Sequence, residues 1–322
     1  MINFRYHVVS ILAVFLALAI GTVMGASFVG RGLIDNLQTR ITEVSQRADE
    51  TKTKNEGLQG EADKFNAYIK ETAPFAVARS LTGVRMNLVA ERGVDGGVVD
   101  AQATLLRQGA GTVPGVIWLE DRWKLDTAQD ASALRTATGL TNKERPALRA
   151  AAAQLLGRRL GATPTATVPP APPVTTDDVL AQLADAKFVT LSGAAGSATP
   201  VATDFVGPAS RVLELGGPGH AVPADVVPGV AGGVLDGGGS TAVGQVFVAS
   251  EATPERGAWI DAIANQDGLR GKISTIDDVE RLEGRVGATL ALSELGLGSV
   301  GNYGLGRERA VPEKVSTVPI AR

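Results

Sequence analysis

The sequence predicts an α/β protein, in which an N-terminal transmembrane helix and a coiled-coil stalk precede a mainly parallel, Rossmann-like α/β domain. Three observations predict this class. Residues 8–30 contain no charged side chain. An apolar repeat of about 3.5 residues, which is typical of coiled coils, runs from Ile34 to Thr72. Further along, short β-prone segments alternate with helical patterns, and this alternation favours parallel strand pairing.

The uncharged run is predicted to be a membrane anchor over residues 1–32. A helix rises ~1.5 Å per residue, so the run covers the ~30 Å hydrocarbon core of a bilayer. The alternative is a cleaved signal peptide, which has a shorter apolar core on the order of 7–15 residues. We favour the uncleaved anchor, because the apolar run continues past the small residues at 25–26.

Two glycines of the anchor, Gly21 and Gly25, are four residues apart and lie on one helix face. Such pairs let two membrane helices pack closely, although glycine is also common in membrane helices without that role. Arg5 and the terminal amine precede the apolar run, and the four charges that follow it at positions 31–43 nearly cancel, so charge orients the anchor weakly. With so short an N-terminal segment, we expect a single pass through the cytoplasmic membrane and an extracytoplasmic bulk.

The predicted stalk, residues 33–73, has apolar residues at most positions of one helical seam. With Ile34 as position a, the a positions are Ile34, Ile41, Ala48, Asn55, Ala62 and Ile69, and the d positions are Leu37, Val44, Thr51, Leu58, Phe65 and Thr72. Asparagine at position a fixes register and strand number in coiled coils. Pro74 is expected to end the helix. The seam predicts a homodimer, and the alternative is a helix that packs on its own domain.

The α/β domain is predicted over residues 74–295, with a proline-rich loop at 161–176 inside one sheet and a flexible tail at 296–322. Strands are predicted at 84–90, 115–120, 187–192, 211–215, 245–250 and 271–275. Helices are predicted at 99–108, 127–138, 143–160, 179–186, 254–266 and 277–295.

Composition limits the chemistry of this chain. The net charge is −3 with both signs interspersed, so there is no basic surface of the kind that binds nucleic acid. The chain has no cysteine and only three methionines, which excludes thiolate sites and a thioether copper relay. His220 is a weak candidate base or metal ligand, but no second histidine accompanies it in the soluble part. We therefore expect no cofactor and no resident metal.

Three motifs suggest binding sites only weakly. Residues 296–301 spell GxGxxG, but they follow a predicted helix, whereas a dinucleotide fingerprint follows a strand. Residues 216–219 are glycine-rich and follow a strand, yet a tight turn explains them better. Glu120 and Asp121 end a predicted strand between two tryptophans, where α/β proteins often bind ligands; a solvated strand end is the simpler interpretation. No catalytic constellation is visible, so we expect no enzyme activity.

Both ends of the chain resemble a known family. The opening MINFRYHVVSILAVFLALAIGTVMG, the stalk, and the segment IDDVERLEGRVGATLALSELGLGSVGNYGLG resemble the MctB-type family of actinobacteria, which is named for copper transport and includes SteB-like cell-separation proteins. The resemblance implies one of two functions. One is copper efflux or an outer-membrane channel in the mycolate layer. The other is control of cell separation, with a SteA-like membrane partner and activation of a peptidoglycan hydrolase.

The residues favour the second function. An outer-membrane channel needs many alternating strands of about ten residues and has no apolar helix of ~20 residues. This chain shows the reverse pattern, and a stalk suits the display of a helical surface to a partner. The expected protein is thus a non-enzymatic, single-pass envelope protein, with copper homeostasis as the alternative.

Overall fold

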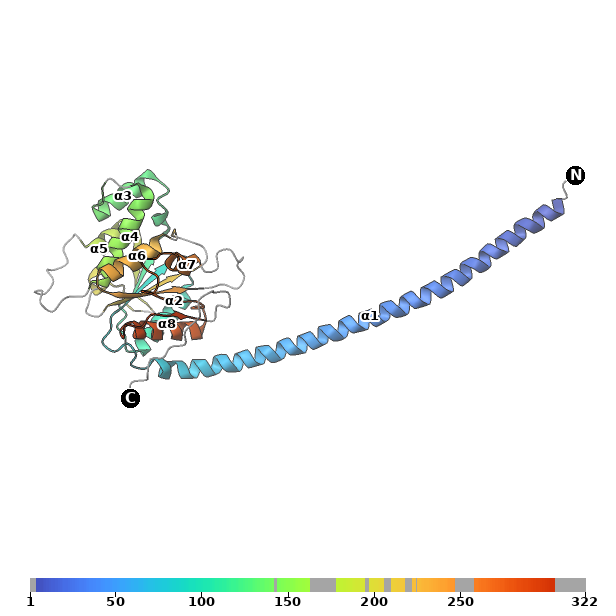
Figure 1. The fold of residues 1–322 in the computed structure, drawn as a ribbon, viewed down its shortest axis with the longest axis horizontal. Helices are drawn as coiled ribbons and strands as arrows, with labels where there is room; N and C mark the ends of the chain where they lie inside the picture. Colours follow the sequence, from blue (N-terminus) through green and yellow to red (C-terminus); the bar gives the residue numbers. More distant parts are fainter. Residues whose placement is uncertain are drawn as a thin grey trace, which may run out of the picture. The chain divides into compact units, whose positions relative to one another are not determined.

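A computed structural model describes residues 4–141, 144–162, 178–194, 197–205, 210–217, 222–223, 225–246 and 258–304. The chain divides into two compact units, residues 1–67 and 68–322. Helix α1 (Phe4–Val77) forms all of the described part of the first unit and the opening of the second (Figure 1). The α/β class with an N-terminal apolar helix is confirmed.

Helix α1 continues through Pro74, so the predicted end of the helix at that residue is wrong. Proline fixes φ near the helical value but removes one backbone hydrogen bond, so it normally costs stability inside a helix. Here the last turn is held by packing, because Ala73 and Val77 are buried against Leu105. Tertiary contacts therefore extend the helix one turn past the residue that local preference selects.

The second unit is built on a seven-stranded sheet in the order β3-β2-β1-β4-β5-β6-β7. Strand β3 pairs antiparallel with β2, and every other pair is parallel. Strands from both sides of the proline-rich segment belong to this one sheet, as predicted. The strands are β1 (Met86–Glu91), β2 (Val116–Leu119), β3 (Val189–Ser192), β4 (Arg211–Gly216), β5 (Ser240–Gln245), β6 (Ser274–Ile276) and β7 (Asn302–Tyr303).

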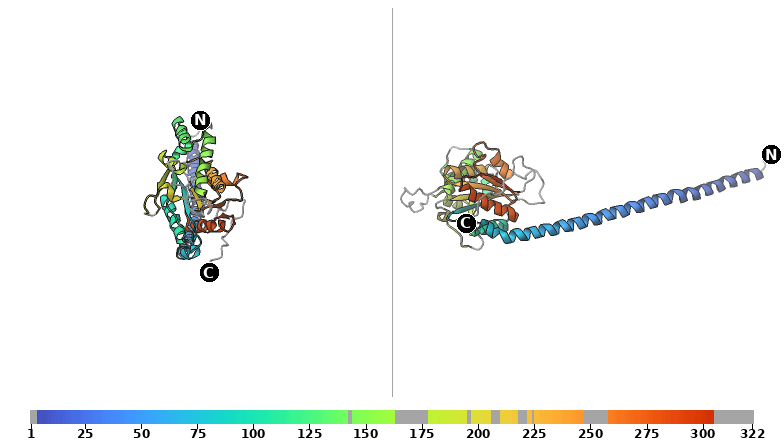
Figure 2. Two further views of the ribbon diagram at one scale, coloured as in Figure 1. Left: turned by 90° about the vertical axis from the view of Figure 1, so that its left-hand side faces the viewer. Right: turned by 60° about the horizontal axis from the view of Figure 1, so that its bottom comes forward.

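Helices cover both faces of the sheet, which is therefore doubly wound (Figures 1 and 2). Helices α2 (Gly96–Gln108) and α8 (Leu282–Leu295) pack on one face. The other face is covered by α3 (Ala128–Thr138), α4 (Arg145–Gly161), α5 (Val179–Asp185), α6 (Val226–Asp236) and α7 (Ala258–Ala264). Two short 3-10 helices, η1 (Asp121–Lys124) and η2 (Ala202–Phe205), lie in connections.

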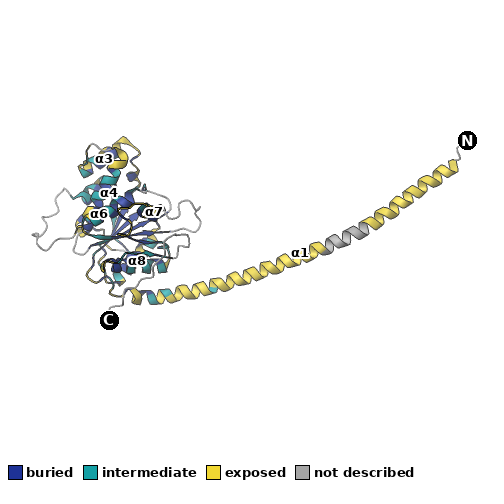
Figure 3. Cartoon of the chain, viewed as in Figure 1, coloured by how far each residue is buried: buried dark blue, intermediate teal, exposed yellow. Residues whose placement is uncertain are grey.

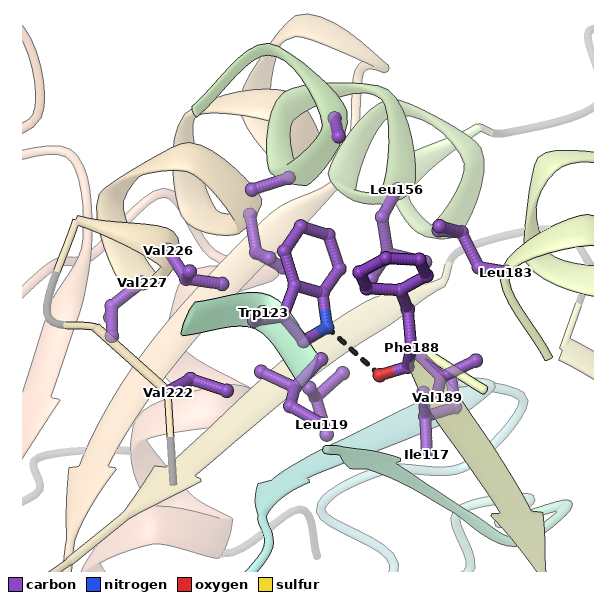
Figure 4. Packing of buried hydrophobic residues seen from close by; sticks show 14 of the residues in the cluster. Ile117, Leu119, Trp123, Leu156, Leu183, Phe188, Val189, Val222, Val226 and Val227 are labelled. Carbon is purple, nitrogen blue, oxygen red and sulfur yellow. Dashed lines mark hydrogen bonds between the residues drawn. The ribbon is translucent and has the colours of Figure 1, made fainter. Parts of the chain in front are cut away.

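Trp123 forms the centre of the core on the α3–α7 face. Its indole Nε1 donates a hydrogen bond of 2.9 Å to the Phe188 carbonyl oxygen, and the two rings meet edge to face with centroids 5.7 Å apart (Figure 4). Because the only polar atom of this fully buried indole is bonded, the side chain adds its apolar area to the core without leaving an unsatisfied polar group.

Helices α4 and α6 cross on glycines. A Cβ at Gly157 would lie 2.0 Å from the Val230 carbonyl oxygen, and one at Gly233 would lie 2.2 Å from that of Gln154. Helix α6 was not predicted, because its sequence, VVPGVAGGVLD, is poor in helix-forming residues. Close packing on α4 offsets that poor propensity, so the helix depends on its tertiary partner.

Several predicted boundaries are wrong. The strand expected at 245–250 is β5 at Ser240–Gln245, and residues 247–250 lie outside the described part. Gly244 lies in a crowded paired position of β5, where a Cβ would lie 2.8 Å from the end of the Leu215 side chain, so a small residue is favoured there. Helix α8 begins at Leu282 rather than at residue 277. The tail is not without structure throughout, because Asn302–Tyr303 form β7.

Candidate functional site

The stalk helix presents apolar side chains that no described residue of its own unit covers. The seam residues Leu37, Ile41, Val44, Leu58 and Phe65 are 51%, 66%, 65%, 64% and 57% exposed. Asn55 lies among them and is also exposed, and the side chain of Ile34 lies outside the described residues. Figure 3 shows the described stalk as an almost continuous exposed surface. Exposed apolar rows of this kind are typical of sites that interact with another protein or with a membrane.

The C-terminal end of the same seam, after Phe65, is partly covered by other residues. Ile69 and Thr72 are half-buried, and one turn on Ala73 and Val77 are buried. Ala73 and Val77 pack against Leu105 of α2. The packing of α1 on its own domain, which the sequence left as an alternative, therefore holds for this end. The free part of the seam is Leu37 to Phe65.

The apolar part of α1 is a single candidate membrane span, Phe4–Gly25, with a mean hydropathy of 2.5. None of the most apolar window is buried against the rest of the described chain. A Cβ added at Gly21 or Gly25 would meet no atom within 4 Å. The helix is thus long and apolar enough for an anchor, while the role of the glycine pair in helix packing stays a prediction.

The domain offers a second candidate where the strand order reverses, between β1 and β4. In open α/β sheets, ligands bind beyond the carboxyl ends of the strands at such a point. Here the buried Glu91 carboxylate accepts hydrogen bonds from the backbone N–H groups of Gly217 (3.3 Å) and Val222 (3.0 Å). At the start of α2, the Asp95 carboxylate accepts one from the Gly97 N–H. The chain's own carboxylates hold these amides, which disfavours a phosphate there.

Glu120, the first acid of the pair that follows β2, is also engaged. Arg92 donates to both carboxylate oxygens of Glu120, at 2.6 Å for the closest contact, and its guanidinium lies 4.6 Å from the centre of the Trp118 ring. Burial alone would raise the pKa of Glu120, but hydrogen bonds from Arg92 and Thr190 and the Arg92 charge lower it. Asp121 begins η1. A paired, ionised Glu120 fits a structural strand end better than an acid–base catalyst.

Buried acids in the sheet were not predicted. Glu214 in β4 is fully buried, and burial raises the pKa of its carboxyl well above the usual range. The Thr241 hydroxyl donates to one of its oxygens at 3.3 Å, and the other oxygen has no partner among the described residues. The sequence RVLELG gives one signal, an acid at an inward position of an otherwise apolar strand, but it does not reveal which face is buried.

The remaining sequence candidates form no site among the described residues. His220 lies outside the described residues. The GxGxxG segment at 296–301 follows α8 and leads into β7, the reverse of the strand-to-helix order of a dinucleotide fingerprint. Within the described residues no group of three or more His, Cys, Asp or Glu side chains could hold a metal ion. Met86 is buried in β1.

Comparison with known proteins shows one family along nearly the whole chain. The family described as "Copper transport outer membrane protein, MctB" matches residues 1–312. The copper transporters MctB of Mycobacterium bovis and of Mycobacterium tuberculosis are 25% identical over 317 residues, which cover 95% of this chain and 97% of each relative. Copper transporter MctB of Mycobacterium leprae is 27% identical over 327 residues, with the same coverage.

Proposed function

We propose that this chain, which belongs to the MctB family, is a non-enzymatic, single-pass cell-envelope protein that binds protein partners. Helix α1 anchors it in the cytoplasmic membrane, and the bulk of the chain is extracytoplasmic. The free seam from Leu37 to Phe65 is the principal binding surface. The observation that carries this proposal is the exposure of five large seam residues on a helix that continues from the apolar span.

The process that the partners control is cell separation. The resemblance to SteB-like proteins implies a SteA-like membrane partner and a peptidoglycan hydrolase whose activity the stalk promotes. A binding role also fits the domain, because the candidate ligand positions of the sheet are filled by Glu91, Asp95 and the Arg92–Glu120 pair. These side chains leave the protein surfaces, rather than a catalytic cleft, as the means of action.

The test is photo-crosslinking from intact envelopes, with a crosslinker placed at Val44 in one variant and at Glu50 on the outer side of the stalk in the matched control. The proposal expects wall hydrolases or division proteins to crosslink from Val44 and not from Glu50. Two aspartates, Ile41→Asp with Leu58→Asp, should abolish these adducts and delay cell separation. Equal adducts from both positions, or normal separation of the double variant, would contradict the proposal.

Copper homeostasis is the second candidate, and the names of the relatives favour it. Such a role needs soft or imidazole ligands, whereas the chain has no cysteine, two histidines and three methionines. A copper titration of the full chain in detergent decides between the two. Tight binding that His220→Ala abolishes, together with copper sensitivity of cells that lack the protein, would replace the cell-separation proposal.

A further inference from the structure

The free seam of the stalk is bordered by positive charge. In the heptad frame that places Ile41 at position a, the residues flanking the seam are the e and g positions. These include Arg40, Arg47, Lys52 and Lys54, all exposed, against the single acid Glu61. The other acids of the stalk lie away from the seam at b and c: Asp35, Glu43, Asp49, Glu50, Glu56, Asp63 and Glu71. The border of the seam is therefore mainly basic, whereas the b and c positions carry seven acids and only two lysines, Lys64 and Lys70.

A second copy of this chain would complement that border poorly. Two copies anchored in one membrane by their N-terminal helices would pair their stalks in parallel, where each g residue faces the e residue five positions along on the other helix. Arg47 then faces Lys52, and symmetry repeats this like-charge contact on the other side. The other g positions, Arg40, Lys54 and Glu61, would face Ser45, Gln59 and Asn66. No ion pair favours the symmetric dimer.

The middle of the seam is also narrow. Its residues are either small, as Ala48 and Thr51 are, or polar, as Asn55 is. They line a shallow hollow on the helix surface, which is bordered by Arg47, Lys52 and Glu56. Lys52 lies 4.0 Å from Glu56, and water and salt weaken this exposed contact. In a symmetric dimer of this chain, the hollow of one stalk would face the hollow of the other stalk. A different helix with larger apolar side chains at this level would fill it.

We propose that the seam binds a helix of another protein whose flanking positions are acidic and whose apolar stripe is widest opposite Ala48 and Thr51. The inference rests on the proposed function and names the chemistry of the partner. Glutamate or aspartate at the partner's flanking positions pairs with Arg40, Arg47, Lys52 and Lys54 on the two sides of the seam. The same charges select against self-pairing, so the homodimer predicted from the heptads alone is disfavoured.

The binding test uses the full chain in detergent and two synthetic heptad peptides. Both carry leucine and isoleucine at a and d; one carries glutamate at e and g, and the other carries lysine. At about 0.15 M salt, where long-range attraction is screened, the glutamate peptide should bind at least about tenfold tighter than the lysine peptide. A peptide of the same composition as the glutamate peptide but with a scrambled heptad should not bind. Equal affinity for all three overturns the proposal.

Charge-reversal variants assign the effect to the border of the seam. Arg47→Glu with Lys52→Glu should invert the preference toward the lysine peptide. The matched control is Lys64→Glu with Lys70→Glu, which reverses two charges at exposed b and c positions. The control should keep the preference of the unmodified chain. A control that inverts it as strongly would mean that net charge, and not the seam, decides binding, and this result rejects the proposal.

Self-pairing is tested directly with Leu58→Cys, because the chain has no other cysteine. Position d side chains of two parallel helices come within disulfide reach when the helices pair in register. In membranes this variant should form little disulfide dimer, and adding Lys52→Glu, which replaces the repulsion by attraction, should increase it severalfold. Abundant dimer without Lys52→Glu would overturn the inference.

The envelope crosslinking of the proposed function separates the two possible failures. If the Val44 adducts persist unchanged in the Arg47→Glu, Lys52→Glu variant, the partner is not acidic and only the present inference fails. If no adduct depends on the seam, the proposed function fails as well.

Discussion

Replacing Glu214 by glutamine should change how the stability of the domain depends on pH. In the folded protein Glu214 is fully buried, its neighbours across the sheet are Val89 and Val243, and burial raises its pKa well above the value of 4.5 expected in the unfolded chain. Above pH 4.5 the unfolded chain therefore loses a proton that the folded protein keeps. Stability falls as pH rises through this window, and it levels off at the folded pKa.

The size of the effect follows from linkage. Each pH unit between the unfolded and folded pKa values costs about 1.4 kcal/mol. Between pH 5 and pH 7 the difference between Glu214→Gln and the unmodified chain should therefore change by up to about 2.7 kcal/mol in favour of the variant. Glutamine keeps an oxygen that accepts the Thr241 hydroxyl, so the substitution alters the titration more than the packing.

The assay is urea unfolding of the full chain in detergent at several pH values, followed by tryptophan fluorescence. All three tryptophans, Trp118, Trp123 and Trp259, are buried in the domain, so the signal reports on its unfolding and not on the stalk.

The control for that titration is Glu120→Gln. Hydrogen bonds from Arg92 and Thr190 outweigh burial and lower the pKa of Glu120, so its contribution is lost as pH falls below about 4.5. The control should therefore run parallel to the unmodified chain between pH 5 and pH 7. If Glu214→Gln also runs parallel, Glu214 is ionised in the folded protein, and the assignment of a neutral buried carboxyl is refuted.

Two further substitutions test the packing of the domain in the same assay. Gly157→Ala should lower the free energy of unfolding by about 1–3 kcal/mol, because the new methyl group overpacks the α4–α6 crossing. The control Gly232→Ala should have little effect, because its Cβ would approach no atom nearer than 3.5 Å. Equal losses of stability in the two variants would contradict the close packing of α4 on α6. Asp178→Ala should cost about 3 kcal/mol, because it removes the cap of α5 and leaves the largely buried Arg159 without its carboxylate. Asp236→Ala, at an exposed ion pair, should cost much less, and a similar loss would show that burial is not the cause.

The sequence predicted those features that repeat along the chain. The apolar span is visible because a run without charge is rare outside membranes, and the seam is visible because its period persists from Leu37 to Phe65. Most strands and helices of the domain were also predicted to within a few residues, because their apolar residues follow a regular period. The end of α1 was not, since burial of Ala73 and Val77 outweighs the local effect of Pro74.

Features that depend on distant neighbours could not be predicted. Helix α6 and strand β5 are rich in small residues, and only the contacts of Gly233 and Gly244 reveal why small residues are needed. The burial of two acids was even harder to predict from the sequence. Glu91 and Glu214 each stand in a short apolar segment, where an acid is usually a solvated strand end. Only the fold shows that one holds two backbone amides and that the other lies inside the sheet.

The stalk itself argues for a partner on energetic grounds. An isolated helix in water gains little from backbone hydrogen bonding alone, and most helices in proteins are stabilised by burial of one face. Here Gly57 and Gly60 weaken the helix further, by up to about 1 kcal/mol each. The five large apolar residues that could supply burial are all more than half exposed. In the binding mode proposed above, a partner helix that covers the seam supplies this burial, and the basic border at Arg47 and Lys52 selects that helix.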